Sequence, residues 1–179
     1  MREEVIDNRV MSSLPGAVTV QEYLRTVYRP DCEYVDGAVL ERNMGEKGHS
    51  KAQGGLYFYL HQRRGELGIC VFVEQRIRIS GTRYRVPDIC VIAGPEPDEE
   101  IFTAPPFLCI EVLSPEDRMS RMQERIGDYL GAGVRYVWVV DPQSHRGWIY
   151  TAGQIQEAAG GVLRTQDPEI VVPLDAIFS

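Results

Sequence analysis

Residues 107–113 read FLCIEVL, a nearly unbroken apolar run of the kind that forms a central strand buried on both faces of a sheet. A second apolar run, YVWVV, occupies residues 136–140. The residues between the two runs have helical spacing up to about Leu130, where a Gly-Ala-Gly sequence ends the helix. A strand, a helix and a second strand in this order normally form a parallel crossover unit. The segment 107–140 therefore predicts two parallel strands at the centre of the fold, joined by a helix.

Working outward from this segment, the hydrophobic periodicity predicts the remaining elements. Helices are expected from a Thr19–Glu22 capping box to a point before Pro30 and over residues 47–64, strands over 71–79, 84–92 and 147–151, and a hairpin over 32–41 with Asp36-Gly37 as its turn. The central helix is expected to begin at residues 114–117, with Ser114 or Asp117 as its N-cap. Residues 94–106 are rich in proline and acid and predict an exposed loop, while the residues after 151 are weakly patterned.

These elements predict a single mixed α/β (α+β) domain over residues 19–179, with a central mixed β-sheet flanked by helices, after a loose N-terminal arm, residues 1–18. A chain of 179 residues is long enough to bury the core of one such domain. No apolar run approaches the roughly 20 residues that cross a bilayer, and the N-terminus lacks the apolar core of a signal peptide. We therefore expect a cytoplasmic protein with no membrane partner.

Neither the cysteines nor the net charge points to a specialised class of protein. The four cysteines, Cys32, Cys70, Cys90 and Cys109, form no C-x-x-C pair, so a zinc site is not expected and we interpret them as buried free thiols. The formal net charge of −7 argues against a protein that coats nucleic acid by bulk electrostatics. The charge remains compatible with an enzyme that combines an acidic metal site with a local basic groove.

Two acidic residues stand where core strands should be apolar. Asp88 follows Pro87 at the start of an apolar run, and Glu111 interrupts the run of residues 107–113. A buried carboxylate is costly unless it is paired, hydrogen-bonded or bound to a metal, and two carboxylates on neighbouring strands repel each other unless a cation or a proton lies between them. Mg²⁺, or Mn²⁺ in its place, would remove this cost because it takes oxygen ligands and keeps several waters. The alternative is that each acid lies at a strand end and pairs with an arginine.

The residues around both acids resemble the Uma-type family of bacterial restriction-endonuclease-like proteins. The similarity covers roughly residues 19–175 and rests on an ordered series of motifs: EYVDG at 33–37 with His49 after it, VPDI at 86–89, IEVLSP at 110–115, and the segment from Tyr129 through GVRYVWVVDP at 133–142. The resemblance implies a PD-(D/E)XK nuclease core, in which an Asp and a Glu bind Mg²⁺ and a lysine two residues after the Glu helps to position or activate water. Asp88 and Glu111, which are 23 residues apart, match the two metal ligands.

One position departs from the superfamily pattern. Leu113 stands where the superfamily has its lysine. In the family that this sequence resembles, the basic residue lies on the following helix, where the matching position is Arg125. Arg125 stays protonated and cannot act as a general base, but it could bind phosphate or stabilise developing negative charge. Arg118 and Arg121 on the same helix are candidates for binding substrate, with a solvated helix face as the alternative.

Further groups are candidates for the same site. Glu33, in the hairpin motif, is a candidate third metal ligand, and the backbone carbonyl of Val112 is another. His49 lies on the apolar side of its predicted helix, where it is either a hydrogen-bonded core histidine or a substrate-binding residue. Glu74 is another candidate third acid, but it shares a strand face with Arg76 and Arg78, which favours a surface ion-pair ladder as the alternative.

These observations predict a Mg²⁺- or Mn²⁺-dependent endonuclease that hydrolyses phosphodiester bonds in DNA. Two alternatives remain: a nuclease-like fold that binds nucleic acid or a protein without cutting, and a non-catalytic protein that assembles with itself. Leu113 and the acidic net charge favour binding without cutting. A chain of this size often cuts duplex DNA as a homodimer, and the apolar segment 170–174 would either serve that interface or close the core.

Overall fold

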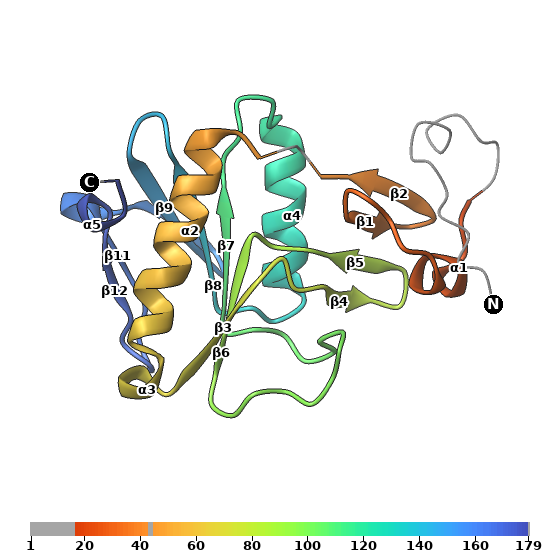
Figure 1. Ribbon diagram of the computed structural model, residues 1–179, viewed down its shortest axis with the longest axis horizontal. Coiled ribbons are helices and arrows are strands. Elements are labelled where there is room, and N and C mark those ends of the chain that lie inside the picture. Colours follow the sequence, from red (N-terminus) through yellow and green to blue (C-terminus); the bar gives the residue numbers. More distant parts are fainter. Residues whose placement is uncertain (1–16, 43–44, 179) are drawn as a thin grey trace.

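A six-stranded mixed sheet runs through the centre of the computed structural model, which describes residues 17–42 and 45–178 (Figure 1). The strand order is β10-β9-β8-β7-β6-β3, formed by β3 (Ile69–Val73), β6 (Ile89–Ala93), β7 (Leu108–Val112), β8 (Tyr136–Asp141), β9 (Arg146–Thr151) and β10 (Gln154–Glu157). β7 and β8 are parallel and are joined through α4 (Met119–Gly131), while the other neighbours pair antiparallel. The predicted parallel crossover at the centre of the fold is therefore confirmed.

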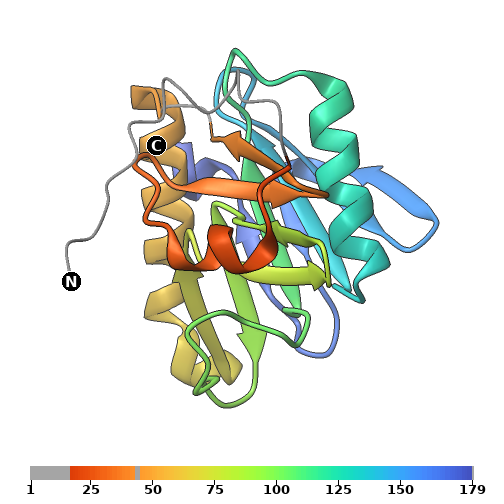
Figure 2. The ribbon, with the colours of Figure 1, turned by 90° about the vertical axis from the view of Figure 1, so that its right-hand side faces the viewer.

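Helices cover both faces of this sheet. α2 (Lys47–Gln62) packs on one face and α4 on the other, as the two side views show (Figures 1 and 2). Each helix buries an apolar stripe with a spacing of three or four residues: Ala52, Leu56 and Leu60 in α2, and Met122, Ile126 and Tyr129 in α4. The prediction of a mixed sheet flanked by helices is thus confirmed.

A second, smaller sheet lies beside the large one, between α2 and α4 when the molecule is seen from that side (Figure 2). The strand order is β2-β1-β5-β4, formed by β1 (Cys32–Val35), β2 (Ala38–Glu41), β4 (Ile77–Ser80) and β5 (Arg83–Arg85). β1 and β2 are the predicted hairpin, and both turn residues, Asp36 and Gly37, have the positive φ angles that a tight two-residue turn requires. α1 (Val20–Arg25) begins at the predicted capping box of Thr19 and Glu22.

Two of the predicted strands are wrong, because each is in fact two strands that belong to different sheets. The expected strand 71–79 ends with β3 and resumes as β4, and Glu74 between them has a φ angle of 51°. The expected strand 84–92 is divided into β5 and β6, with Pro87 between them. A positive φ leaves the extended region, and proline lacks the N–H that a strand interior uses. The two breaks carry the chain from the large sheet into the small one and back.

The central helix begins later than predicted. α4 starts at Met119, and its N-cap is Arg118 rather than Ser114 or Asp117. The Ser114 N–H donates to Asp117 Oδ2 at 2.7 Å, and the Asp117 N–H donates to the Ser114 carbonyl at 2.9 Å. Local bonds of this kind compete with helix formation, so these residues close a turn before the helix instead of capping it.

The weakly patterned C-terminal part folds onto the large sheet. It forms β11 (Val162–Arg164), β12 (Val171–Pro173) and α5 (Asp175–Phe178), after a short 3-10 turn at Ala159–Gly161. Within the segment 170–174, Ile170, Val172 and Leu174 are buried in the same core as the apolar stripe of α2. This segment therefore helps to close the core, and its use in a dimer interface stays a prediction.

The remaining fold expectations have mixed outcomes. Residues 1–16 of the predicted arm lie outside the described residues, whereas Val18 donates from its N–H to the Gly37 carbonyl at 3.0 Å. The loop 94–106 is largely exposed as predicted, but Phe102 is buried against Phe72. The cysteines form no disulfide in the described ranges; three are buried and Cys70 is half-buried. Across those ranges, no helix has the length and apolar character needed to cross a bilayer.

Candidate functional site

The two acids singled out in the sequence lie next to each other at the junction of the two sheets. Asp88 directly precedes β6, and Glu111 lies near the end of β7. β6 and β7 are antiparallel neighbours with Ile89 opposite Ile110, so the next pair in the same register is Asp88 and Glu111. Both side chains are buried, at 4% and 2% exposure. The fold thus places two carboxyl groups together in a region of low solvent access.

Asp88 is held from several directions. Arg42 Nη2 donates to Asp88 Oδ1 at 2.6 Å, while Oδ2 accepts the Val112 N–H at 2.7 Å and lies 3.2 Å from His49 Nε2. Gln53 Nε2 donates to the backbone carbonyl of the same residue at 3.1 Å. Burial alone would raise the pKa of Asp88, but the hydrogen bond from His49, the charge of Arg42 and the Val112 N–H outweigh it and lower the pKa below its ordinary value. Asp88 is therefore a carboxylate at neutral pH.

Glu111 is in the opposite situation. Burial raises the pKa of Glu111 to about 7, and the charges of Asp88 and Glu33 act in the same direction, against the lowering influence of Arg125 and Tyr129. The Tyr129 hydroxyl donates to Glu111 Oε1 at 2.6 Å, whereas Arg125 Nη1 is 3.6 Å from Oε2. Glu111 therefore has a short hydrogen bond at Oε1 and a longer ion pair at Oε2. Of the two acids, its charged form would be stabilised more by an added cation.

Arg125 connects Glu111 to a second buried acid, Glu33 of β1. Arg125 Nε donates to Glu33 Oε2 at 3.2 Å. The same oxygen accepts from Arg85 Nη1 at 2.8 Å, and Oε1 accepts the Val86 N–H at 3.2 Å. Glu33 is 1% exposed, so its negative charge is balanced by these two arginines. In this arrangement Glu33 fixes the position of the Arg125 guanidinium beside Glu111.

Of the other site candidates from the sequence, one contacts Asp88 and two are exposed. His49 is half-buried and hydrogen-bonded to Asp88, and this bond raises its pKa despite burial. A role of His49 in binding substrate stays a prediction. Arg118 and Arg121 are exposed at the start of α4. Leu113, in the position of the superfamily lysine, packs with the apolar residues on the α4 side of the sheet.

The interpretation of Glu74 as part of a surface ladder with Arg76 and Arg78 is wrong. Glu74 follows the end of β3, and its positive φ takes it out of the alternation that the ladder assumed. Glu74 Oε1 pairs instead with Arg42 Nη1 at 3.2 Å. Arg42 therefore bridges Glu74 and Asp88, which connects this strand end to the site.

Four residues of the site were not identified from the sequence: Arg42, Gln53, Arg85 and Tyr129. Gln53 lies four residues after His49 on the same helix, and this spacing could have identified it. Tyr129 appeared at the start of a motif shared with the family, and the structure buries its ring on α4 with its hydroxyl as the polar tip. Arg42 binds Asp88, which is 46 residues away in the sequence, and Arg85 binds Glu33, which is 52 residues away. A local sequence pattern does not indicate contacts at such separations.

The donor set fits a hydrated Mg²⁺ better than a metal enclosed by protein ligands. Among the described residues, no group of three or more Asp, Glu, His and Cys side chains is arranged to hold a metal ion. Mg²⁺ is commonly bound through one or two carboxylates, with water and substrate phosphate as its other ligands, whereas structural Zn²⁺ takes four protein ligands. A charged Asp88 beside a Glu111 whose pKa is raised by burial meets the first description.

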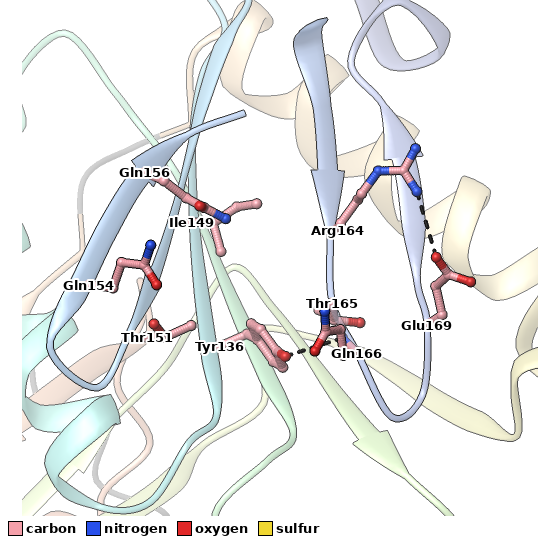
Figure 3. A pocket seen from close by; sticks show the side chains of 9 residues that line it. All are labelled: Tyr136, Ile149, Thr151, Gln154, Gln156, Arg164, Thr165, Gln166 and Glu169. Carbon is pink, nitrogen blue, oxygen red and sulfur yellow. Dashed lines mark hydrogen bonds and ion pairs between the residues drawn. The ribbon is translucent and has the colours of Figure 1, made fainter. Parts of the chain in front are cut away.

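A separate hollow of about 330 Å³ lies between β9, β10 and the β11 region (Figure 3). Its polar lining includes Tyr136, Thr151, Gln154, Gln156 and Gln166. Tyr136 begins β8, whereas Val139 and Val140, towards the other end of that strand, pair with Glu111 and Val112. The ion pair in this hollow, Arg164 with Glu169 at 3.6 Å, joins two exposed side chains. The hollow therefore lacks the buried, coupled acids that distinguish the site at Asp88.

Comparisons with known proteins agree with this arrangement. A crystal structure of a putative nuclease belonging to DUF820 from Anabaena variabilis has the same fold, with a TM-score of 0.77 and 22% sequence identity, over 92% of this chain and 98% of that chain. The search of curated proteins gives no match. The family model Uma2, described as a putative restriction endonuclease, matches residues 20–175. The resemblance seen in the sequence is thus confirmed, and this protein, with its nuclease fold, belongs to the Uma2 family of restriction-endonuclease-like proteins.

Proposed function

We propose that this protein is a Mg²⁺- or Mn²⁺-dependent endonuclease that hydrolyses phosphodiester bonds in DNA. The observation that carries the proposal is the pair of buried, adjacent acids, one held charged and the other with its pKa raised to about 7. Buried charges of this kind add little to stability compared with apolar residues, and strongly perturbed carboxyl groups are typical of functional sites. In a protein of a nuclease-like family, a cation-binding site for hydrolysis is the role that this pair fits best.

Asp88 and Glu111 would hold the ion, with the backbone carbonyl of Val112 as a further oxygen ligand. When bound, the ion would polarise the scissile phosphate and lower the pKa of a bound water. His49 and the Val112 N–H orient Asp88 by binding Oδ2, and Tyr129 orients Glu111 by binding Oε1. Arg125 is charged at every accessible pH, so its task would be to bind the phosphate and stabilise the negative charge that develops there.

Incubation of the full chain with supercoiled plasmid in Mg²⁺, in Mn²⁺ and in EDTA tests this proposal. We expect nicking or linearisation in the presence of the divalent ions and none in EDTA. Arg118 and Arg121, exposed at the start of α4, are proposed to contact DNA phosphates outside the buried site. Absence of cleavage in both metals, on supercoiled and on denatured DNA, would count against hydrolysis.

The affinity for Mg²⁺ is expected to fall as the pH is lowered through about 7. The pKa of Glu111 is raised to about 7, so the neutral acid predominates below that pH and must lose its proton before it can bind the ion. Calorimetric titration at pH 6 in two buffers of different ionisation enthalpy should show release of about one proton per ion, with little release at pH 8. The Asp88→Ala/Glu111→Ala double variant should bind no ion. If the wild type bound Mg²⁺ with the same affinity at pH 6 and pH 8, the role given to Glu111 would be contradicted.

A second function, binding of nucleic acid or of a protein without cutting, is favoured by one specific observation. Arg42 forms an ion pair with Asp88 at 2.6 Å, and Arg125 forms one with Glu111 at 3.6 Å. In addition, Leu113 replaces the superfamily lysine. Two guanidinium groups can neutralise the acids without a metal. Salt-dependent DNA binding without cleavage in Mg²⁺, Mn²⁺ or Co²⁺ would favour this function over the first.

We also propose that cleavage of both strands of a duplex requires a homodimer, because one chain presents one pair of acids. Light scattering coupled to size exclusion, with and without a short duplex, measures the mass in solution. A monomer that linearises DNA only through independent nicks would contradict this proposal.

A further inference from the structure

The outer side of α2 carries a concentration of positive charge that the metal site does not use. Residues 47–64 contain two lysines, two arginines and no acidic residue, although the net charge of the chain is −7. Lys47 and Lys51 are the two lysines of the whole sequence, and both are exposed. With Gly54 and Phe58 they form one exposed stripe, since these residues are three or four positions apart on the helix. A local basic stripe on an acidic protein is the electrostatic footprint of an anionic partner.

A groove of about 300 Å³ lies beside this stripe and extends to the candidate metal site. It is lined by Ser50, Gln53, Gly54 and Tyr57 of α2 and by Val73 and Glu74 at the end of β3. Gln53 donates to the Asp88 carbonyl, and Glu74 pairs with Arg42, which also binds Asp88. The groove therefore begins at the residues that hold Asp88, and the one acid in its lining is neutralised by an arginine.

The groove is open to solvent on its outer side. Its outer rim is open at Gly54, where an added Cβ would meet no atom within 4 Å. In Figure 1, α5 lies beside α2. The groove itself lies between α2 and the end of β3. A volume of about 300 Å³ is that of a pocket for one small ligand.

Phe58 supplies the second kind of contact that a single strand uses. Its side chain is 61% exposed, and it is the one exposed Phe, Tyr or Trp within residues 17–42 and 45–178. An aromatic ring in water can stack on an unpaired base, and this contact is tolerant of sequence because every base has a π face. A base within a duplex is already stacked and paired, so it does not offer this contact.

We propose that the exposed stripe of α2 and its groove bind a single-stranded segment of DNA and lead it to Asp88 and Glu111, so that unpaired DNA is the preferred substrate. Lys47 and Lys51 contact backbone phosphates, Phe58 stacks on a base, and the groove holds the strand between them. This inference rests on the proposed function for the cutting step, because it names the substrate that the metal site would cut. The binding step can be measured without any cleavage.

Fluorescence anisotropy with the full chain in EDTA tests the binding step. The probes are a labelled 12-nucleotide oligo(dT) and a labelled DNA hairpin. Each strand of the hairpin stem carries the same number of phosphates as the oligo(dT). We expect the single strand to bind at least tenfold more tightly than the hairpin. Phe58→Ala should weaken single-strand binding by roughly tenfold, in line with the loss of one stacked base, and Phe58→Trp should restore it. Lys47→Gln/Lys51→Gln should reduce the slope of log K against log salt by about 1.4, for two lost phosphate contacts.

Gly54→Glu provides a variant with a matched control in Gly127→Glu. Both glycines are exposed, lie within helices and have no neighbouring atom within 4 Å of an added Cβ, so both variants should fold. A carboxylate at position 54 enters the groove, whereas one at position 127 lies on α4. We expect a loss of about tenfold in single-strand affinity for Gly54→Glu and no loss for Gly127→Glu, with equal thermal midpoints within a few degrees.

Three results would overturn the inference: duplex bound as tightly as the single strand, wild-type affinity in Phe58→Ala and Gly54→Glu, or no salt-dependent DNA binding by the wild type. The last of these would assign the stripe to an acidic protein partner. If the wild type binds single strands but cuts no DNA, and the variants lose binding, hydrolysis is refuted and the binding step of this inference is retained. Cleavage of single strands by all variants at the wild-type rate would support hydrolysis and refute this inference.

Discussion

Replacing Glu111 with glutamine is expected to abolish metal-dependent cleavage and, in the same protein, to increase the free energy of unfolding at pH 8. The first effect follows from loss of a charged metal ligand, and we expect the rate to fall by roughly a thousandfold or more. The second follows from burial, which raises the pKa of Glu111 to about 7 because the carboxylate is disfavoured inside the metal-free fold. Glutamine keeps an acceptor for the Tyr129 hydroxyl and has no charge to bury.

The pH dependence separates this effect from a general change in stability. The folded protein binds the Glu111 proton more tightly than the unfolded chain does, so the wild type loses stability as the pH rises from about 4.5 to about 7. We expect similar free energies of unfolding for both proteins at pH 5, and an advantage of roughly 1 to 2 kcal/mol for Glu111→Gln at pH 8, measured by urea denaturation in EDTA. Glu116→Gln, at an exposed acid in the following turn, is the matched control and should change neither property.

A Glu111→Gln protein that still cut DNA in Mg²⁺ would show that the acids serve another purpose. A variant that lost activity and also unfolded at pH 8 would show that Glu111 is a structural anchor through Tyr129. Asp88→Asn adds a contrast, because the pKa of Asp88 is lowered below its ordinary value by its partners. The charged form of Asp88 stabilises the fold above the unfolded pKa, so this variant should lose both activity and stability at pH 8.

The sequence predicted the centre of the site because its signal is local. Glu111 interrupts a run of apolar residues, and Asp88 follows a proline at the start of another, so each acid is anomalous within its own strand. The crossover accounts for the parallel pair β7 and β8, and the structure adds β6 as the antiparallel partner of β7, which brings Asp88 beside Glu111. Periodicity and the cost of burying charge were sufficient for this part.

The surroundings of the acids could not be predicted in the same way. Continuous alternation suggested single strands over 71–79 and 84–92, and it gave no sign that the chain turns into a second sheet at Glu74 and Pro87. That second sheet brings Glu33 and Arg85 to the site, and Arg42 directly follows its strand β2. Hydrophobic patterning reports which face of an element is buried, whereas the partner of a buried charge depends on contacts that are distant in sequence.

The other large expected effect concerns the buried arginine of the small sheet. Arg85→Met should decrease the free energy of unfolding by roughly 3 to 5 kcal/mol, because it leaves Glu33 and Asp128 without their shared cation. Arg85 is 2% exposed; it donates to Glu33 Oε2 and to Asp128 Oδ2, both at 2.8 Å. Urea denaturation with a double-mutant cycle measures the effect. Glu33→Gln/Arg85→Met should be more stable than the sum of the single changes predicts, since the buried charge that keeps only its longer pair with Arg125 is then absent.

Arg83→Met is the matched control, because Arg83 lies on the same strand and also pairs with Asp128, at 2.8 Å. Its side chain is 28% exposed and its other partners, Asp36 and Glu124, are more exposed still. Exposed ion pairs are screened by water, so this change should cost less than about 1 kcal/mol. Equal losses for the two variants would mean that burial does not set the strength of this network. A large loss confined to Arg85, recovered by neutralising Glu33, would mean that the small sheet is held to α4 through the same buried charges that position Arg125 beside Glu111.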